Sequence, residues 1–179
     1  SGTVDAARQA ADITETNVTV VDSDFTSRSM GMIVKEAAKS AQDGKTVEEI
    51  LEIIEDAKKR TTLYLTVVNL DNLIKGGRIS QLMGMFSNLL NIKLFLQVIN
   101  GKIEIIQKGR GLKSLQKKYD EIFEQMKSAP KGIQEIGIMH AGLSDFNEGN
   151  IARVRELFPD VPLTIVTTSP IIMSHTGVD

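Results

Sequence analysis

The residues best suited to binding chemistry stand near the end of the chain, where the sequence reads His175-Thr176-Gly177. An imidazole, a hydroxyl and the accessible N–H groups around a glycine together suit a carboxylate or a phosphate. A second polar motif, Ser1-Gly2-Thr3, directly precedes a helical pattern at the other end. It is either an ordinary helix N-cap or an anion seat, because a helix N-terminus presents unpaired N–H groups and a favourable dipole.

Four further features have a structural interpretation, and three of them also a functional one. Gly76-Gly77-Arg78 fits a helix C-cap followed by a locally paired arginine. His140 ends a strand-like run and fits a hydrogen-bonded structural histidine better than a catalytic one. The run Lys108-Gly109-Arg110-Gly111 is either a solvated loop or a basic patch for an anion or a partner. A methionine- and leucine-rich cluster either packs in the core or lines an adaptable apolar pocket, and it includes Met83, Phe86 and Leu89.

Composition removes several classes of function. The chain has no cysteine and two histidines outside any metal-binding spacing, so we expect neither a disulfide framework nor a metal site. A net charge of −2 gives no electrostatic footprint for nucleic acid. No nucleophile elbow, Walker A motif or dinucleotide fingerprint is present. Without a membrane-length apolar run or a signal-like start, we expect a soluble, cytoplasmic protein.

Hydrophobic periodicity predicts the elements that must position these residues. In the first part of the chain it predicts helices at 4–13, 29–41 and 47–59 and strands at 18–21 and 63–68. Thr46 and Glu49 form a capping box before the third helix. The order α-β-α-α-β is consistent with an α/β unit built on parallel strands.

Beyond residue 68 the pattern changes to α+β. Asn100-Gly101 joins two β-patterned runs, which predicts a hairpin with a type I′ turn. The remaining predicted elements are helices at 70–75, 81–90, 112–127 and 145–158 and strands at 93–99, 102–107, 133–140 and 163–167. We therefore predict two domains, residues 1–61 and residues 62–179, the second with a mixed sheet.

At this point the sequence resembles a known family. Residues 73–80 (LIKGGRIS) followed by 88–93 (NLLNIK) resemble the central signature of the DegV family. Further motifs occur in the family's order and span essentially the whole chain: Ser1-Gly2-Thr3, Val21-Asp22-Ser23, Asn100-Gly101-Lys102, Lys108-Gly109-Arg110-Gly111 and His175-Thr176-Gly177. The resemblance implies that residues 1–61 are the remainder of the N-terminal DegV α/β domain and residues 62–179 the C-terminal α+β domain.

The resemblance also implies a function. DegV-like proteins bind one long-chain fatty acid in an apolar tunnel, and several are the fatty-acid-binding subunit (FakB) of a bacterial fatty acid kinase. A separate kinase subunit phosphorylates the presented carboxyl group, and the acyl-phosphate serves phospholipid synthesis. By this resemblance the chain is a carrier without catalytic residues or a cofactor. Its partners are the fatty acid, the kinase subunit and, transiently, a membrane or an acyltransferase, with no nucleic acid.

The site residues follow from the same resemblance. Ser1, Gly2, Thr3, His175 and Thr176 are expected to bind the fatty-acid carboxylate. Arg110 is expected at the pocket mouth, in contact with the kinase subunit or the phosphate. Met83, Phe86 and Leu89 are our candidates for the tunnel wall.

One departure from the family pattern keeps alternatives open. Family members carry a segment before the Ser-Gly-Thr motif, with the first sheet strand and a Thr-Ser-x-Pro-Ser-like loop, and this sequence starts at the motif itself. A missing strand would expose a sheet edge and favour self-association. The alternatives are a small hydrolase or phosphotransferase using His175, and a truncated fragment that binds nothing and forms homo-oligomers.

Overall fold

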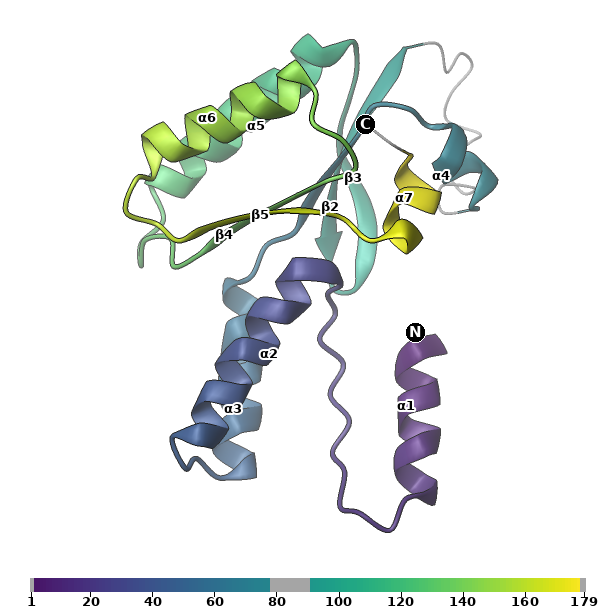
Figure 1. The fold of residues 1–179 in the computed structure, drawn as a ribbon, viewed down its shortest axis with the longest axis vertical. Coiled ribbons are helices and arrows are strands. Elements are labelled where there is room, and N and C mark those ends of the chain that lie inside the picture. Colours follow the sequence, from purple (N-terminus) through teal and green to yellow (C-terminus); the bar gives the residue numbers. More distant parts are fainter. Residues whose placement is uncertain (1, 78–90, 178–179) are drawn as a thin grey trace. The chain divides into compact units, whose positions relative to one another are not determined.

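The chain divides into two compact units, residues 1–61 and residues 62–179. This computed structural model describes residues 2–77 and 91–177 (Figure 1). Helices and strands both occur, which confirms the mixed α/β class. The helix expected at 81–90 lies outside the described residues. Among the helices that the structure describes, none is long and apolar enough to cross a bilayer.

The first unit consists of helices α1 (Gly2–Ile13), α2 (Ser27–Gln42) and α3 (Val47–Arg60). The predicted capping box is confirmed, because the Thr46 hydroxyl accepts the Glu49 N–H at 3.3 Å and the Glu49 carboxylate accepts the Thr46 N–H at 2.9 Å. Helices α2 and α3 pack against each other and bury Ile33 and Ala57. This unit is therefore organised around a helical hairpin.

The strand predicted at residues 18–21 is wrong. These residues form neither helix nor strand, and the parallel sheet expected in this part of the chain is not present among residues 2–61. A strand is defined by the neighbour to which it hydrogen-bonds, and no strand within the described ranges pairs with this segment. Directly after this segment the chain is bonded to α3, because the Lys58 ammonium donates to the Asp22 carbonyl at 3.0 Å.

The second unit is built on a three-stranded antiparallel sheet in the order β1 (Tyr64–Val67), β2 (Ile92–Ile99), β3 (Lys102–Arg110). Asn100 and Gly101, between β2 and β3, have φ values of 50° and 71°. Positive φ at both positions is the requirement of a type I′ turn, so the predicted hairpin is confirmed.

Both faces of this sheet are covered by helices. Along β2, Leu94 and Leu96 point to one face, where they pack with Leu73 of α4 (Asp71–Lys75). Phe95 points to the other face and packs against Leu115 of α5 (Leu112–Lys127). Side chains alternate between faces along a strand, so this continuous apolar run anchors α4 on one side and α5 on the other.

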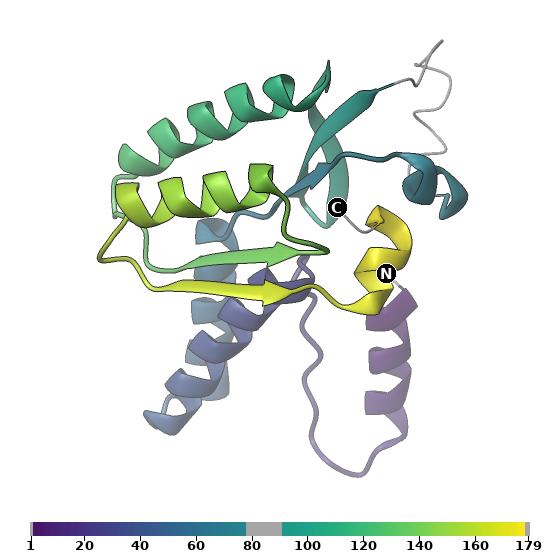
Figure 2. The same cartoon turned by 45° about the horizontal axis from the view of Figure 1, so that its top comes forward.

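A second, two-stranded sheet is parallel. Its strands β4 (Ile136–His140) and β5 (Leu163–Thr167) are joined through α6 (Asp145–Leu157), and α7 (Pro170–Thr176) follows β5 (Figure 2). This unit therefore contains both parallel and antiparallel strand pairs. Within the described residues they lie in two separate sheets rather than in one mixed sheet. Helices α5 and α6 are linked by hydrogen bonds between the Gln116 and Asn150 side-chain amides at 3.0 and 3.2 Å.

Candidate functional site

His175 and Thr176 lie in the last turn of a helix rather than in a turn that follows a strand. Ser169 is the N-cap of α7 and Pro170 occupies its first turn. Gly177 ends the helix with φ +86°, and its N–H donates to the Met173 carbonyl at 2.8 Å. Ser-Pro at the start and glycine just past the end are a helix signature that could have predicted α7 from the sequence.

The β4–β5 sheet fixes where α7 begins. The Thr168 N–H donates to the His140 carbonyl at 2.9 Å and so continues the parallel pairing beyond Thr167. Helix α7 follows at once from Ser169, and it lies beside α4 in both views (Figures 1 and 2). The carboxyl end of β5 thus places the helix that carries His175 next to the end of α4.

The contact between α4 and α7 leaves little space for a side chain at Gly76 or at Gly177. A Cβ atom added at Gly76, the C-cap of α4, would lie 2.5 Å from His175 Nδ1 and 3.3 Å from its Cε1. A Cβ atom added at Gly177 would lie 3.1 Å from Nδ2 of Asn72. The fold therefore brings two predicted motifs, Gly76-Gly77 and His175-Thr176-Gly177, into direct contact. Sequence reasoning missed Asn72, which no motif marks.

The polar atoms of this contact have different hydrogen-bonding states. Nδ1 of His175 is buried and has no hydrogen-bond partner in the part of the chain that the structure describes. The Thr176 hydroxyl donates to the Ile172 carbonyl at 3.1 Å, within its own helix. The Ser174 hydroxyl likewise donates to the Ile171 carbonyl at 2.7 Å. Neither neighbouring hydroxyl is paired with the imidazole, so this geometry gives no support to a hydrolase that uses His175 as base.

The motif at the start of the chain lies in the first unit. Gly2 and Thr3 form the first turn of α1 and are exposed, and Ser1 lies outside the described residues. Helix α1 has no buried residue. Since His175 and Thr176 belong to the second unit, their joint action with Gly2 and Thr3 on one ligand stays a prediction.

Arg110 is exposed at the end of β3, where it pairs with Ile92. The loop interpretation of this region is wrong, because residues 108–110 belong to the strand. The turn that follows is tight: a Cβ atom at Gly109 would collide with the Ser114 side chain, whose hydroxyl donates to the Gly111 carbonyl at 2.7 Å. This turn holds Arg110 at the junction of β3 and α5.

His140 is the second imidazole with a buried, unpartnered nitrogen. Its Nδ1 atom has no hydrogen-bond partner within residues 2–77 and 91–177. Over these residues, His140 is therefore not the fully hydrogen-bonded structural histidine that the sequence suggests. Over the same residues, no group of three or more histidines and carboxylates could hold a metal ion.

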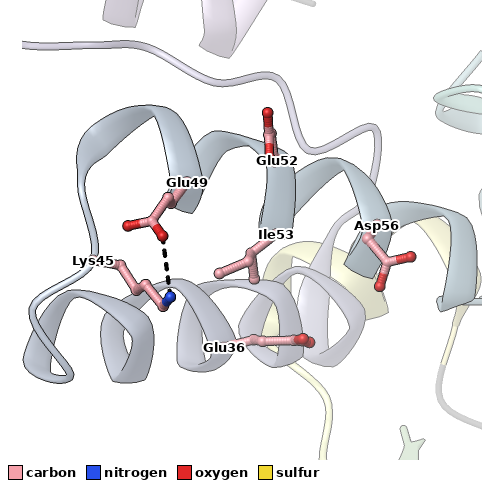
Figure 3. A pocket seen from close by; sticks show the side chains of 6 residues that line it. All are labelled: Glu36, Lys45, Glu49, Glu52, Ile53 and Asp56. Atoms are coloured by element: carbon pink, nitrogen blue, oxygen red, sulfur yellow. Dashed lines mark hydrogen bonds and ion pairs between the residues drawn. The ribbon is translucent and has the colours of Figure 1, made fainter.

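A hollow of about 380 Å³ on the α2–α3 hairpin has the wrong charge for a fatty acid (Figure 3). Glu36, Glu49, Glu52 and Asp56 line it together with Lys45 and Ile53. The Thr46 backbone N–H and the Lys45 ammonium lower the pKa of Glu49, which keeps that carboxylate charged. The predicted tunnel-wall residues Met83, Phe86 and Leu89 lie outside the described residues.

Comparison with known proteins gives consistent results. The model of the DegV family matches residues 1–179. A DegV domain-containing protein of Streptococcus pneumoniae is 41% identical over 177 residues, covering 99% of this chain and 62% of the relative. One from Listeria innocua is 40% identical over 178 residues, covering 99% and 63%. The chain thus spans less than two thirds of these relatives.

Solved structures with the same fold are named as fatty-acid-binding proteins. A DegV family protein from Thermus thermophilus, named for fatty acid binding, has a TM-score of 0.78 and 29% identity, covering 99% of this chain and 64% of its own. The Streptococcus pneumoniae Fatty Acid Kinase (Fak) B3 protein loaded with linoleic acid has a TM-score of 0.78 and 27% identity, with the same coverage. The fatty acid binding DegV family protein SAG1342 from Streptococcus agalactiae has a TM-score of 0.86 and 26% identity, covering 99% and 63%.

Proposed function

The chain belongs to the DegV family, and from that premise we propose that it binds a long-chain fatty acid and presents the carboxylate to a separate kinase subunit. Its own role is that of a bacterial carrier: the kinase subunit phosphorylates the presented carboxyl group, and the chain carries the resulting acyl-phosphate onward. The proposal is supported by the three solved relatives named above for a fatty acid. The observation that carries it is the α4–α7 contact, which turns Nδ1 of His175 toward Gly76 and holds the ring beside Thr176 in the last turn of α7.

The chemistry of this segment suits a carboxylate. A ring nitrogen that carries a proton donates to a carboxylate oxygen, and such charge-assisted hydrogen bonds are about twice as strong as neutral ones. The Thr176 hydroxyl joins in as a donor only if it leaves the Ile172 carbonyl. A carboxylate removed from water needs these partners, because burying it unpaired is prohibitively costly.

The other predicted residues keep their roles as part of the proposal. Ser1, Gly2 and Thr3 belong to the carboxylate-binding set, since the first turn of a helix presents N–H groups without intrahelical partners and the positive end of the helix dipole, and Gly2 and Thr3 lie in the first turn of α1. Arg110 contacts the kinase subunit or the phosphate. The tunnel wall supplies most of the affinity, because each CH₂ removed from water contributes about 0.8 kcal/mol.

The first test is mass spectrometry of the purified chain under native and then denaturing conditions. A released long-chain fatty acid in stoichiometric amount is the expected result. If the chain is isolated without lipid, titration with oleate gives the affinity. The titration is measured by calorimetry, because the chain has no tryptophan whose fluorescence could report binding. A chain that neither carries nor takes up a fatty acid contradicts the proposal, and concentration-dependent mass without lipid supports the self-associating fragment instead.

The head-group assignment has its own test. His175→Ala and Thr3→Ala should each weaken oleate binding by about 1.5–3 kcal/mol, roughly tenfold to 150-fold, because each removes one hydrogen bond to a charged group. Non-additive losses in the double variant are expected if both residues bind the same carboxylate. Arg110→Ala, at an exposed position, is the control and should leave oleate affinity unchanged. Full affinity in both single variants contradicts the assignment.

A further inference from the structure

Gly76 occupies a backbone conformation that any residue can adopt. Its φ and ψ of −77° and −2° are right-handed and helical. Its N–H donates to the Asn72 carbonyl at 2.8 Å, and the N–H of Gly77 donates to the Ile74 carbonyl at 3.0 Å. The turn is therefore fixed by ordinary C-cap hydrogen bonds, and its backbone angles do not require glycine at position 76, although a Cβ atom would lie 3.1 Å from the Asn72 carbonyl oxygen.

What position 76 lacks is space for a side chain. A Cβ atom there would lie 2.5 Å from Nδ1 of His175, closer than the 3.0 Å that real Cβ atoms essentially always keep. Its distance to Cε1 of the same ring would be 3.3 Å. The imidazole thus lies directly against the bare Cα of Gly76, and any side chain at this position must displace one of the two partners.

The two partners are held with very different strength. Helix α4 is anchored in the core of the three-stranded sheet by Leu70 and Leu73, which are 5% and 3% exposed. Helix α7 has seven residues and buries none of them. Burial of a leucine side chain contributes roughly 1.5–3 kcal/mol, so moving α4 costs more than moving α7. A side chain at position 76 would therefore displace the His175 ring and leave α4 in place.

We propose that Gly76 is a positioning residue, whose missing side chain seats the His175 ring on the end of α4 and so aims its Nε2 edge at the ligand. With Nδ1 turned toward Gly76 and buried, the ring meets a carboxylate through its other nitrogen. Asn72, one turn earlier in α4, lies next to Gly177, since a Cβ atom added there would be 3.1 Å from its Nδ2 atom. This inference rests on the proposed function, in which His175 binds the fatty-acid carboxylate.

The experiment compares Gly76→Ala with the wild-type chain in two measurements. The first, without ligand, is the imidazole ¹H–¹⁵N spectrum of His175 and the nuclear Overhauser contact between its Hε1 and the Hα protons of residue 76. The second is oleate affinity. Gly149→Ala is the matched control, because a Cβ atom at Gly149 in α6 meets nothing within 4 Å. Thermal unfolding verifies that both variants are folded.

In Gly76→Ala we expect shifted His175 ring signals, loss of the Overhauser contact, and oleate affinity reduced roughly tenfold to 150-fold, as for loss of the His175 hydrogen bond itself. Gly149→Ala should change none of these. In a His175→Ala background, Gly76→Ala should cause no further loss, because the clash has been removed. That result separates positioning from a general packing defect, which would weaken binding in either background.

Two results would overturn the inference. Unchanged ring signals in Gly76→Ala would show that position 76 does not set the ring, whatever the lipid data. An equal loss of affinity in the presence and absence of the His175 side chain would show that Gly76 acts otherwise than through the imidazole. If the wild-type chain binds no fatty acid, the proposed function fails, while the ring signals still decide whether Gly76 seats His175.

Discussion

Replacing Gly177 by alanine should loosen the end of α7 without unfolding the protein. Gly177 has φ +86° and ψ 178°, a region that is essentially restricted to glycine. Forcing an alanine into it costs about 1–3 kcal/mol. An added Cβ atom would also lie 3.1 Å from Asn72 Nδ2, a tight contact that the flexible amide can partly relieve. We therefore take about 1–3 kcal/mol as the total destabilisation of the last turn of α7 by alanine at position 177.

That cost should appear locally, because α7 buries no residue of its own. The Gly177 N–H donates to the Met173 carbonyl at 2.8 Å, so hydrogen exchange at this amide reports opening of the last turn. A loss of about 1–3 kcal/mol corresponds to exchange at position 177 that is roughly 5-fold to 150-fold faster. The midpoint of global unfolding should change little, since the core around Leu94 and Phe95 is untouched.

The assay is native-state hydrogen exchange followed by NMR, with Gly149→Ala as control. Gly149 lies within α6, has no positive φ and leaves open space for a methyl group. Alanine there should stabilise α6 by about 1 kcal/mol and leave exchange at position 177 unchanged. Equal exchange at position 177 in Gly177→Ala and the wild type would refute the argument from backbone strain.

Two further predictions concern stability. Leu94→Ala should lower the free energy of unfolding in urea titrations by about 2–5 kcal/mol, because Leu94 is fully buried. Ile103→Ala, at a position that is 44% exposed, should lower it much less. Equal losses in the two variants would contradict the assigned core. Hydrogen bonds from Arg153 and then Gln116 lower the pKa of Asp120 in the folded state. The contribution of Asp120 to the free energy of unfolding is therefore complete above the unfolded-state pKa of about 3.9, and it is lost as pH falls through the lower folded-state pKa. Asp120→Asn should therefore destabilise by less than about 1 kcal/mol at neutral pH, since solvent screens this exposed pair, and the difference from wild type should vanish in strong acid; a difference that grows in acid would contradict it.

Local structure was largely predictable from the sequence. The Thr46–Glu49 capping box and the Asn100-Gly101 turn need only side chains and backbone angles within a few residues. Helix α5 and strand β5 have the predicted bounds, because each depends on one uninterrupted periodic pattern. The end of α4 at Gly76-Gly77 followed from the same local chemistry, because Gly77 adopts φ +66°, the left-handed conformation that favours glycine after a helix.

Contacts between distant parts of the chain could not be predicted in the same way. The apolar run at residues 18–21 has the composition of a strand, but pairing requires a neighbour whose position the run itself does not specify. The family resemblance marked Gly76 and His175 as separate motifs. Only the packing of α4 on the sheet and of α7 beyond β5 places the imidazole against the bare Cα of Gly76, because a contact of this kind depends on where two anchored elements end in space.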